Sequence, residues 1–339
     1  MQYQNKPFSI SVVLPTFNRI NRIKKCLPSF LKTEVKDVQF IIIDNNSNDG
    51  TWNYLKSVAI NDARVKIYKN PQNIGPIKTI FRGYCEVKSP YAIFLSDDDF
   101  MIGDYIAKCL EIFSKHDDVS IIHHSVDKWQ KAEKRYQVSY TLYSKGYEAI
   151  ANMFALSGAY TGLSFRMSCF NLSNFPLEKN VLYPQVKIGI DMTRKYNMAM
   201  IHNCGMIAVD FGDTVESVKK KQNRPDSMGI NERLSYALEL KDKFLIQTIA
   251  FKLADWGIRL FQKIEKENVK QSRQFAKSLF FTLNNVTPYF IICLFKIKKY
   301  NLALYSLISL IYKPSFFINY IWFIIFAFKK FYLKRKKKN

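Results

Sequence analysis

Residues 38–44 read VQFIIID, an unbroken apolar run that ends in a carboxylate and continues into the turn residues NNSNDGT. Strands that are buried on both faces of a parallel sheet have such continuous apolar runs. Three further stretches of the first hundred residues also read as strands, namely FSISVVLP (8–15), VKIYK (65–69) and YAIFL (91–95). Helical patterns separate these four stretches, and this alternation predicts an α/β domain with a largely parallel sheet.

The helical patterns carry their own signals. Apolar residues recur at helical spacing in residues 20–31, although Pro28 argues against an unbroken helix there. Pro76 follows Gly75 and suits the first turn of another helix. Residues 185–202 predict a helix that leads into a further strand. The α/β pattern is therefore expected to continue beyond the first hundred residues.

Charge and cysteine content narrow the class of protein. The chain has 339 residues and a net charge of +23, but residues 268–339 hold 14 Lys and Arg residues and no Asp or Glu, which leaves +9 for the rest. The six cysteines are scattered and form no CxxC pair, which is typical of a reduced protein rather than a disulfide scaffold or zinc site. The first residues lack a signal-peptide pattern. We therefore expect the catalytic part to stay in the cytoplasm.

Polar clusters follow three of the predicted strands. They are PTFNR (15–19), DNNSNDG (44–50) and SDDD (96–99). Ligands of open α/β sheets bind outside the carboxyl ends of the strands, where such loops converge. The sequence thus predicts one ligand site built from three separate loops.

Each cluster alone has an ordinary alternative. Asp97, Asp98 and Asp99 are suited to share Mg²⁺ or Mn²⁺ with a diphosphate, because Mg²⁺ is commonly held by one or two carboxylates and substrate phosphates. They could equally form a solvated acidic turn. Asp44 at a strand end could accept hydrogen bonds from a base or ribose, or belong to a plain turn rich in Asn and Asp. Gly75 lies where a backbone could approach a ligand and a helix could begin.

Taken together, the clusters resemble a known family. The stretches SVVLPTFNR (11–19), IIIDNNSNDGT (41–51), NIG (73–75) and FLSDDDF (94–100) occur in the order and spacing of family 2 glycosyltransferases with the GT-A fold. The resemblance is strong over residues 8–105 and extends in outline over 106–215. Among these enzymes the chain is most similar to bacterial ones that build O-antigen, capsule and related surface polysaccharides. The LSDDD form resembles the abequosyltransferase-like branch.

The resemblance implies a Rossmann-like, nucleotide-binding mixed sheet and assigns roles to single residues. The implied nucleotide-sugar-binding residues are Pro15, Thr16, Asn18, Arg19, Asp44, Asn46, Ser47, Gly75, Asp97 and Asp98. The implied metal ligands are Asp97, Asp98 and Asp99, with Mn²⁺ or Mg²⁺ as the cofactor. Two registers remain open. Asp97 and Asp99 form the DxD pair, or Ser96 occupies the first acidic position and Asp98 binds the metal.

The resemblance also implies an inverting, single-displacement transfer from a nucleotide-diphosphate sugar, assisted by a general base. Relatives take this base from an ED motif at the start of a helix. Asp191 is the one carboxylate in YPQVKIGIDMTRK and is the candidate base, although the spacing points nearer Gln185 and Val186. Asp191 could equally be a solvated helix residue. His123, His124 and His202 are expected to be structural or to line the acceptor site.

The C-terminal part predicts a second domain, with the glycosyltransferase domain at 1–222 and a helical region at 223–339. Residues 315–328 form a 14-residue apolar run, which is shorter than the roughly 20 residues of a spanning helix. The basic cluster at 329–338 suits anionic headgroups. We expect a peripheral, membrane-associating tail on the cytoplasmic face of a bacterial membrane, close to a lipid-linked saccharide acceptor. A nucleic-acid-binding tail and an ordinary helical subdomain are the alternatives.

Two other functions compete with glycosyl transfer. A non-catalytic nucleotide-sugar or polysaccharide-binding module on a degenerate GT-A scaffold would explain the missing ED motif. A nucleotidyltransferase would be α/β and metal-dependent, but its glycine-rich loop after the first strand is expected where PTFNR has no glycine. The sequence therefore favours a glycosyltransferase.

Overall fold

The computed structural model describes residues 8–124, 138–156, 160–178, 181, 183–208, 227–240, 242–243, 245–250, 253–254 and 262. The chain divides into two compact units, Met1–Asp213 and Thr214–Asn339. The boundary predicted at 222/223, the apolar run at 315–328 and the basic cluster at 329–338 lie outside the described residues. In the second unit the described helix is α9, Ser227–Leu238. Among the described residues, none of the helices has the length and apolar character needed to span a bilayer.

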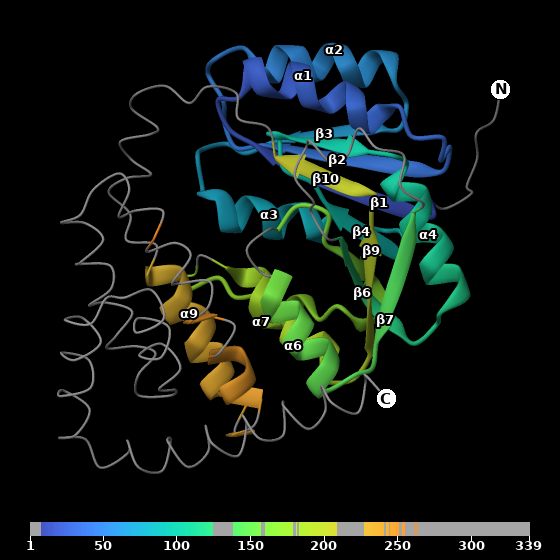
Figure 1. Ribbon diagram of the computed structural model, residues 1–339. Helices are drawn as coiled ribbons and strands as arrows, with labels where there is room; N and C mark the ends of the chain where they lie inside the picture. The colour runs from blue at the N-terminus through green and yellow to red at the C-terminus, as the bar shows by residue number, and fades with distance from the viewer. Residues whose placement is uncertain are drawn as a thin grey trace. The chain divides into compact units, whose positions relative to one another are not determined.

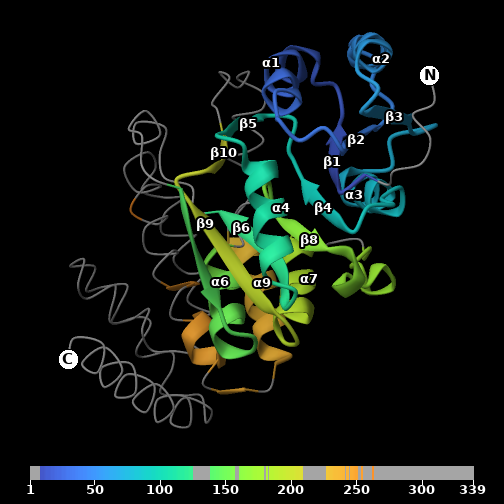
Figure 2. The same cartoon turned by 90° about the vertical axis from the view of Figure 1, so that its right-hand side faces the viewer.

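Two sheets form the first unit. The strands of the main sheet, in chain order, are β1 (Ile10–Thr16), β2 (Val38–Asp44), β3 (Val65–Lys69), β4 (Tyr91–Phe94), β6 (Val119–His124), β7 (Ser139–Tyr143), β8 (Ser164–Arg166) and β9 (Asn197–His202). Their spatial order in the described part of the chain is β3-β2-β1-β4-β8-β6-β9-β7. The short strands β5 (Asp99–Ile102) and β10 (Gly205–Ala208) pair antiparallel in a second sheet, and Figure 2 shows them side by side.

The strand directions set the place of the loops. Strands β1, β2, β3 and β4 are mutually parallel, and Thr16 at the end of β1 lies in register with Asp44 at the end of β2. β8 runs antiparallel to β4 and to β6, while β9 runs parallel to β6. The carboxyl ends of β1, β2 and β4 therefore share one edge of the sheet, as the sequence predicted. The sheet is mixed because of β8 and β7.

Helices cover both faces of the main sheet. They are α1 (Ile20–Leu31), α2 (Thr51–Asn61), α3 (Pro76–Cys85), α4 (Tyr105–Lys115), α6 (Tyr147–Leu156) and α7 (Pro184–Thr193). Buried side chains of α1, α2 and α4 pack on one face, and those of α3, α6 and α7 pack on the other. Figure 1 shows α1 and α2 on one side of β1, β2 and β3, and α3 on the opposite side.

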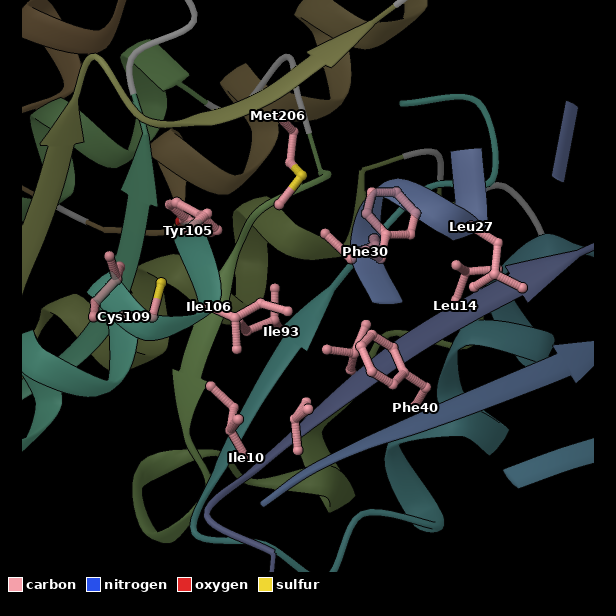
Figure 3. Close-up of a cluster of buried hydrophobic side chains, with 14 of the residues drawn as sticks. Ile10, Leu14, Leu27, Phe30, Phe40, Ile93, Tyr105, Ile106, Cys109 and Met206 are labelled. Carbon is pink, nitrogen blue, oxygen red and sulfur yellow. The ribbon is translucent and has the colours of Figure 1, made fainter. Parts of the chain in front are cut away.

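Alternation along the strands explains why their sequences are apolar throughout. Val12 and Leu14 of β1 belong to the core beneath α1, whereas Val13 between them belongs to the core beneath α3. Each face removes its side chains from water, so that both sets stabilise the fold. Figure 3 shows part of the first core, including Leu27 and Phe30 of α1.

The sequence-based expectation of a broken first helix was wrong. α1 is continuous and contains Pro28 in its interior. Pro28 and Lys24 are both exposed, while Ile23 and Leu27 are buried. Proline removes the hydrogen bond to the carbonyl four residues earlier, that of Lys24. Because these residues lie on the solvent side, water can replace the lost donor while the apolar face keeps the helix in place.

Candidate functional site

A hydrogen bond joins the ends of β1 and β4. Thr16 Oγ1 donates to Asp97 Oδ2 over 2.6 Å, and both residues are buried. Leu95, just after β4, donates its backbone N–H to Val13 of β1 over 3.0 Å. These contacts fix the position of the aspartate-rich segment against the first loop. The structure thus brings together two of the three predicted polar clusters.

The first and second loops are also joined. Asn18 donates its backbone N–H to Ser47 Oγ over 2.9 Å, and Asn18 Oδ1 accepts from the backbone N–H of Asn48 over 3.0 Å. Asn18 and Asn46 have positive φ angles of 51° and 67°, a conformation that asparagine tolerates better than most residues. Pro15 is the residue before the end of β1 and lies in register with Ile43. The predicted residues of both loops therefore lie at one edge of the sheet.

One carboxylate oxygen of Asp44 accepts hydrogen bonds and the other has no hydrogen-bond partner. Its Oδ1 accepts from the backbone N–H of Ser47 over 3.1 Å and from the Ser47 hydroxyl. Its Oδ2 is buried and has no hydrogen-bond partner. A buried acceptor without a partner is costly unless a ligand supplies a donor. A base N–H or a ribose hydroxyl would meet this need, provided that the surrounding loop opens enough to admit it.

An asparagine network that the sequence did not reveal supports Gly75. Asn45 Nδ2 donates to Asn73 Oδ1 over 2.7 Å, and Asn45 Oδ1 accepts from Asn70 Nδ2 over 2.8 Å and from the backbone N–H of Ile74 over 3.0 Å. Asn73 Oδ1 also accepts from the backbone N–H of Gly75 over 2.9 Å. The run of polar residues after β2 was the available signal, but it did not single out Asn45. The network holds the start of α3 against the second loop.

Two of the three aspartates are buried. Asp97 is 8% exposed and Asp99 is 4% exposed. Burial raises the pKa of Asp97 to about 6, although the Thr16 hydrogen bond and the Arg19 charge oppose this rise. Burial also raises the pKa of Asp99 to about 6, opposed by a hydrogen bond from Thr161 and reinforced by the neighbouring carboxylates. Both side chains therefore pay a cost in the ionised state.

Asp98 has a different environment. Its side chain is 34% exposed, and its Oδ2 lies 3.2 Å from Arg22 Nη1 and 3.9 Å from Arg19 Nη1. Its Oδ1 accepts from the hydroxyl of Ser96. The resemblance had pointed to Arg19, whereas Arg22 was missed. The signal that could have found Arg22 is its position one helical turn after Arg19 at the start of α1.

The aspartates do not assemble into a closed metal site. Within the described residues, no three side chains of the His, Cys, Asp or Glu types are grouped to hold a metal ion. Asp97 accepts a hydrogen bond from Thr16, Asp99 is buried, and Asp98 faces the two arginines. A cation bound by all three carboxylates is therefore not the observed arrangement. The partly exposed carboxylate of Asp98 fits the simpler case in which one carboxylate and a substrate diphosphate share the cation.

Asp191, the predicted base, does not lie with these loops. It belongs to the last part of α7, which connects to the amino end of β9. It lines a cavity of about 420 Å³ together with Ser168, Asn171, Lys195 and Tyr196. Ser168 follows β8, whose Arg166 lies in register with Tyr91 at the start of β4. The cavity thus lies at the amino edge of the strands, opposite the aspartates, and the start of α7 near Gln185 points to the other edge.

The buried ring of His124 supports residues 96–99 through Thr161. Its ring lies against Gly162 and Gly205, where an added Cβ would approach the imidazole to 2.3 and 2.4 Å. His124 Nε2 lies 3.2 Å from the carbonyl oxygen of Thr161, and the Thr161 hydroxyl accepts from the backbone N–H of Ser96 over 3.2 Å. Burial is the main cause that lowers the pKa of His124 to about 3, so the imidazole is neutral. This role agrees with the structural alternative that the sequence left open.

Comparison with known proteins supplies the family. The family model described as Glycosyl transferase family 2 matches residues 11–182, which is just over half of the chain. The matched segment contains the three loops at the carboxyl edge. It also contains Asn45, Arg22 and Thr161, which the structure adds to the site.

Similar proteins include bacterial glycosyltransferases. The chain is 30% identical over 104 residues to a GalNAc(5)-diNAcBac-PP-undecaprenol beta-1,3-glucosyltransferase of Campylobacter jejuni, which is 30% of this chain and 33% of that protein. It is 29% identical over 101 residues to an uncharacterized glycosyltransferase of Haemophilus influenzae, covering 30% and 40% of the two chains. Chondroitin synthase of Pasteurella multocida is 27% identical over 114 residues, 34% of this chain and 12% of that one. The chain thus spans well under half the length of these relatives.

Solved structures confirm the fold. The crystal structure of S. aureus TarS 1–349 has a TM-score of 0.57 at 10% identity and covers 83% of both chains. The same protein in complex with UDP-GlcNAc has a TM-score of 0.53 at 12% identity, over 84% of this chain and 83% of that one. The mixed sheet flanked by helices is the GT-A fold that the sequence predicted.

Proposed function

Since this chain belongs to glycosyl transferase family 2, we propose that it transfers a sugar from a nucleoside-diphosphate donor to a saccharide acceptor. The observation that carries the proposal is the convergence of three loops at one sheet edge, held by the Thr16–Asp97 and Asn18–Ser47 hydrogen bonds. This edge combines a buried acceptor without a partner, Asp44 Oδ2, with a partly exposed carboxylate, Asp98. The first suits a nucleoside, and the second suits a cation at the diphosphate.

The chemistry that we propose is a single displacement with inversion. The acceptor hydroxyl attacks the anomeric carbon and gives its proton to a general base. The bond from that carbon to the diphosphate oxygen breaks in the same step, through an oxocarbenium-like state, and the nucleoside diphosphate leaves. A divalent cation, Mg²⁺ or Mn²⁺, shared by Asp98 and the diphosphate would supply positive charge against the charge that grows on the leaving group. Asp97 and Thr16 hold the segment that carries Asp98, and Asp44 orients the nucleoside.

Lipid-linked saccharides are the acceptor class that we propose, within synthesis of a bacterial surface polysaccharide. The Campylobacter relative is named for a saccharide joined through PP to undecaprenol, which supports this class. The membrane association of residues 315–338 on the cytoplasmic face stays part of the proposal. Flotation of the full-length protein on anionic and zwitterionic vesicles tests it, with Lys334–Lys338 replaced by glutamine for comparison. Equal flotation of both proteins on anionic vesicles would exclude a role for the basic cluster.

The main test measures donor turnover. Purified protein is incubated with a panel of nucleotide sugars, with Mg²⁺, Mn²⁺ or EDTA, and the released nucleoside diphosphate is quantified. We expect one donor to be turned over, and Asp98→Asn to lower the rate by about a hundredfold or more. Asp117→Asn is the matched control, because Asp117 is exposed and precedes β6 at the opposite edge of the sheet. Full activity of Asp98→Asn would contradict the assigned role of this carboxylate.

One observation favours a second candidate function, a nucleotide-sugar-binding module without transfer. Residues 183–190, which include the start of α7, contain no Asp or Glu, and Asp191 lies toward the opposite edge. The two functions differ in a simple way. Both give thermal stabilisation by the nucleotide sugar, but only the transferase releases nucleoside diphosphate from it.

A further inference from the structure

Two guanidinium groups at the start of α1 face the carboxylate of Asp98. Arg19 is the residue before the helix and Arg22 lies in its first turn, and both point an Nη1 atom at the same oxygen, Asp98 Oδ2. The Arg22 contact, at 3.2 Å, is also a hydrogen bond. All three side chains retain access to solvent, with exposures of 38% for Arg19, 20% for Arg22 and 34% for Asp98. They form a partly exposed ion cluster at the ligand edge.

This cluster conflicts with the charge that the proposed donor brings. A diphosphate needs cationic partners, and Asp98 in the same place would repel it. Two backbone N–H groups at the start of α1 are already engaged, because Arg19 N–H bonds to Thr51 Oγ1 over 3.2 Å and Ile20 N–H bonds to Asp49 Oδ2 over 3.0 Å. The two guanidinium groups carry full positive charges at this end of α1 and are partly exposed, so they are suited to bind an anion. To do so they have to leave Asp98.

We propose that Arg22, assisted by Arg19, binds the diphosphate of the donor and exchanges Asp98 for it. Before the donor arrives, the arginines neutralise Asp98. When it arrives, the guanidinium groups pair with phosphate oxygens, for which their fork of donors is well matched. Asp98 is thereby released to the cation that the diphosphate carries, while Ser96 keeps hold of its Oδ1. The exchange rests on the proposed function and adds a diphosphate-binding residue, Arg22, to it.

The exchange predicts how the cation and the diphosphate affect each other's affinity. A divalent cation alone has to compete with two guanidinium groups for Asp98, and a diphosphate alone has to displace a carboxylate from them. Each ligand therefore removes the competitor of the other, so that cation and diphosphate bind cooperatively. The cation and the diphosphate also attract each other directly, so the coupling that the exchange adds is the part that is lost when Arg22 is replaced.

Isothermal titration calorimetry of the full-length protein tests the exchange with two probes, inorganic pyrophosphate and Mn²⁺, separately and together. Pyrophosphate is chosen because it carries the shared chemistry of every nucleotide-sugar donor. We expect Arg22→Gln to weaken pyrophosphate binding by about tenfold. The same variant should bind Mn²⁺ alone several times more tightly than wild type does. Arg22→Lys, which keeps the charge and loses the fork, should recover part of the pyrophosphate affinity.

Lys24→Gln is the matched control. It removes the same charge from the same helix, and Lys24 is exposed, with its ammonium over the ring of Tyr54 at 5.8 Å. Both of its affinities should stay at the wild-type values. A second variant, Asp98→Asn, gives an independent measurement. In EDTA it should bind pyrophosphate more tightly than wild type, because the carboxylate that occupies Arg22 is gone.

The outcomes separate the exchange from the proposed function. Equal pyrophosphate affinity of Arg22→Gln and Lys24→Gln overturns the exchange, even if wild type turns over a nucleotide sugar. Unchanged Mn²⁺ affinity of Arg22→Gln overturns it as well. If wild type binds neither pyrophosphate nor any nucleoside diphosphate, both proposals are wrong. Should Arg22→Gln fail to fold, the Asp98→Asn measurement decides, and pyrophosphate affinity no tighter than in wild type would contradict the exchange.

Discussion

The hydroxyl of Thr16 donates a hydrogen bond of 2.6 Å to Asp97, a residue 81 positions later in the chain. Thr16 ends β1 and Asp97 follows β4, and the two strands are parallel neighbours. Because both residues are buried, the bond lies in a setting where an unpaired carboxylate would be costly. It fixes the loop that presents Asp98 to the ligand edge.

Replacing Thr16 by valine should therefore destabilise the protein in a pH-dependent way. The change keeps the side-chain shape and removes the donor to Asp97, which should lower the free energy of unfolding by about 1.5–3 kcal/mol when the carboxyl is ionised. The pKa of Asp97 should also rise further, because this bond lowers it. Urea denaturation at pH 8 and pH 4.5 measures both effects, and the loss should be smaller at pH 4.5.

Thr141→Val serves as the control for that experiment. Thr141 is exposed and its hydroxyl lies 2.9 Å from His202 Nε2, so its loss should change the free energy of unfolding by only about 0.5 kcal/mol. An equal loss of unfolding free energy in both variants would show that the Thr16–Asp97 hydrogen bond stabilises the fold no more than an exposed one does.

The stability of the metal-free protein should depend on the ionisation of Asp97 and Asp99. Their pKa values of about 6 in the folded state exceed the ordinary value of 3.8. A raised pKa stabilises the fold below about pH 4, and this contribution is lost as the pH rises through 6. Asp97→Asn should therefore gain stability over wild type between pH 4 and pH 7, by at most about 3 kcal/mol.

Urea denaturation in EDTA from pH 4 to pH 8 measures this gain as the difference between variant and wild type. Asp117→Asn, at an exposed position, is the control for the Asp-to-Asn substitution itself. A difference for Asp97→Asn that does not change with pH would mean that the pKa of Asp97 is not raised in the folded state.

The asparagine network should contribute to stability. Asn45 is 4% exposed and makes three side-chain hydrogen bonds, to Asn73, Asn70 and the backbone of Ile74. Asn45→Ala removes all three bonds, including the one to the buried Asn70, and should cost about 1–3 kcal/mol. Asn61→Ala is the comparison, since Asn61 is exposed and bonds only within α2, to the Ser57 carbonyl. Chemical denaturation that finds the two variants equally stable would argue against the network.

Alanine substitutions at Gly162 and Gly50 distinguish the cost of close packing from the cost of backbone strain. Both have left-handed φ angles, +79° and +95°, so alanine is strained at either position. At Gly50 a Cβ meets nothing within 4 Å, whereas at Gly162 it would lie 2.3 Å from the buried ring of His124. Gly50→Ala should cost about 1 kcal/mol, and Gly162→Ala should cost several kcal/mol or prevent folding. Thermal denaturation of both proteins makes the comparison, and equal melting temperatures would contradict the close packing at His124.

Local sequence patterns predicted the elements well where burial alone decides them. The ranges 38–44 and 65–69 are strands to the residue. The run 38–44 is apolar because it is almost completely buried in the sheet, whereas 65–69 is a partly exposed strand at the edge of the sheet. Pro76 opens α3 as expected. The prediction that Pro28 breaks the first helix was wrong. The cost of a proline depends on whether the carbonyl that loses its hydrogen bond faces solvent, and the local sequence does not show this.

The sequence by itself determined the GT-A sheet, the three polar loops and the family, since these follow from apolar runs and short motifs that are local along the chain. Only the tertiary structure decided which side chains meet. It buried Asp97 and Asp99, left Asp98 facing Arg22, and showed that α7 carries Asp191 toward the edge opposite the aspartates. The physical reason is that strand order and direction, with β8 antiparallel between β4 and β6, set where each helix begins and ends. The spacing of the motifs along the chain does not indicate that direction.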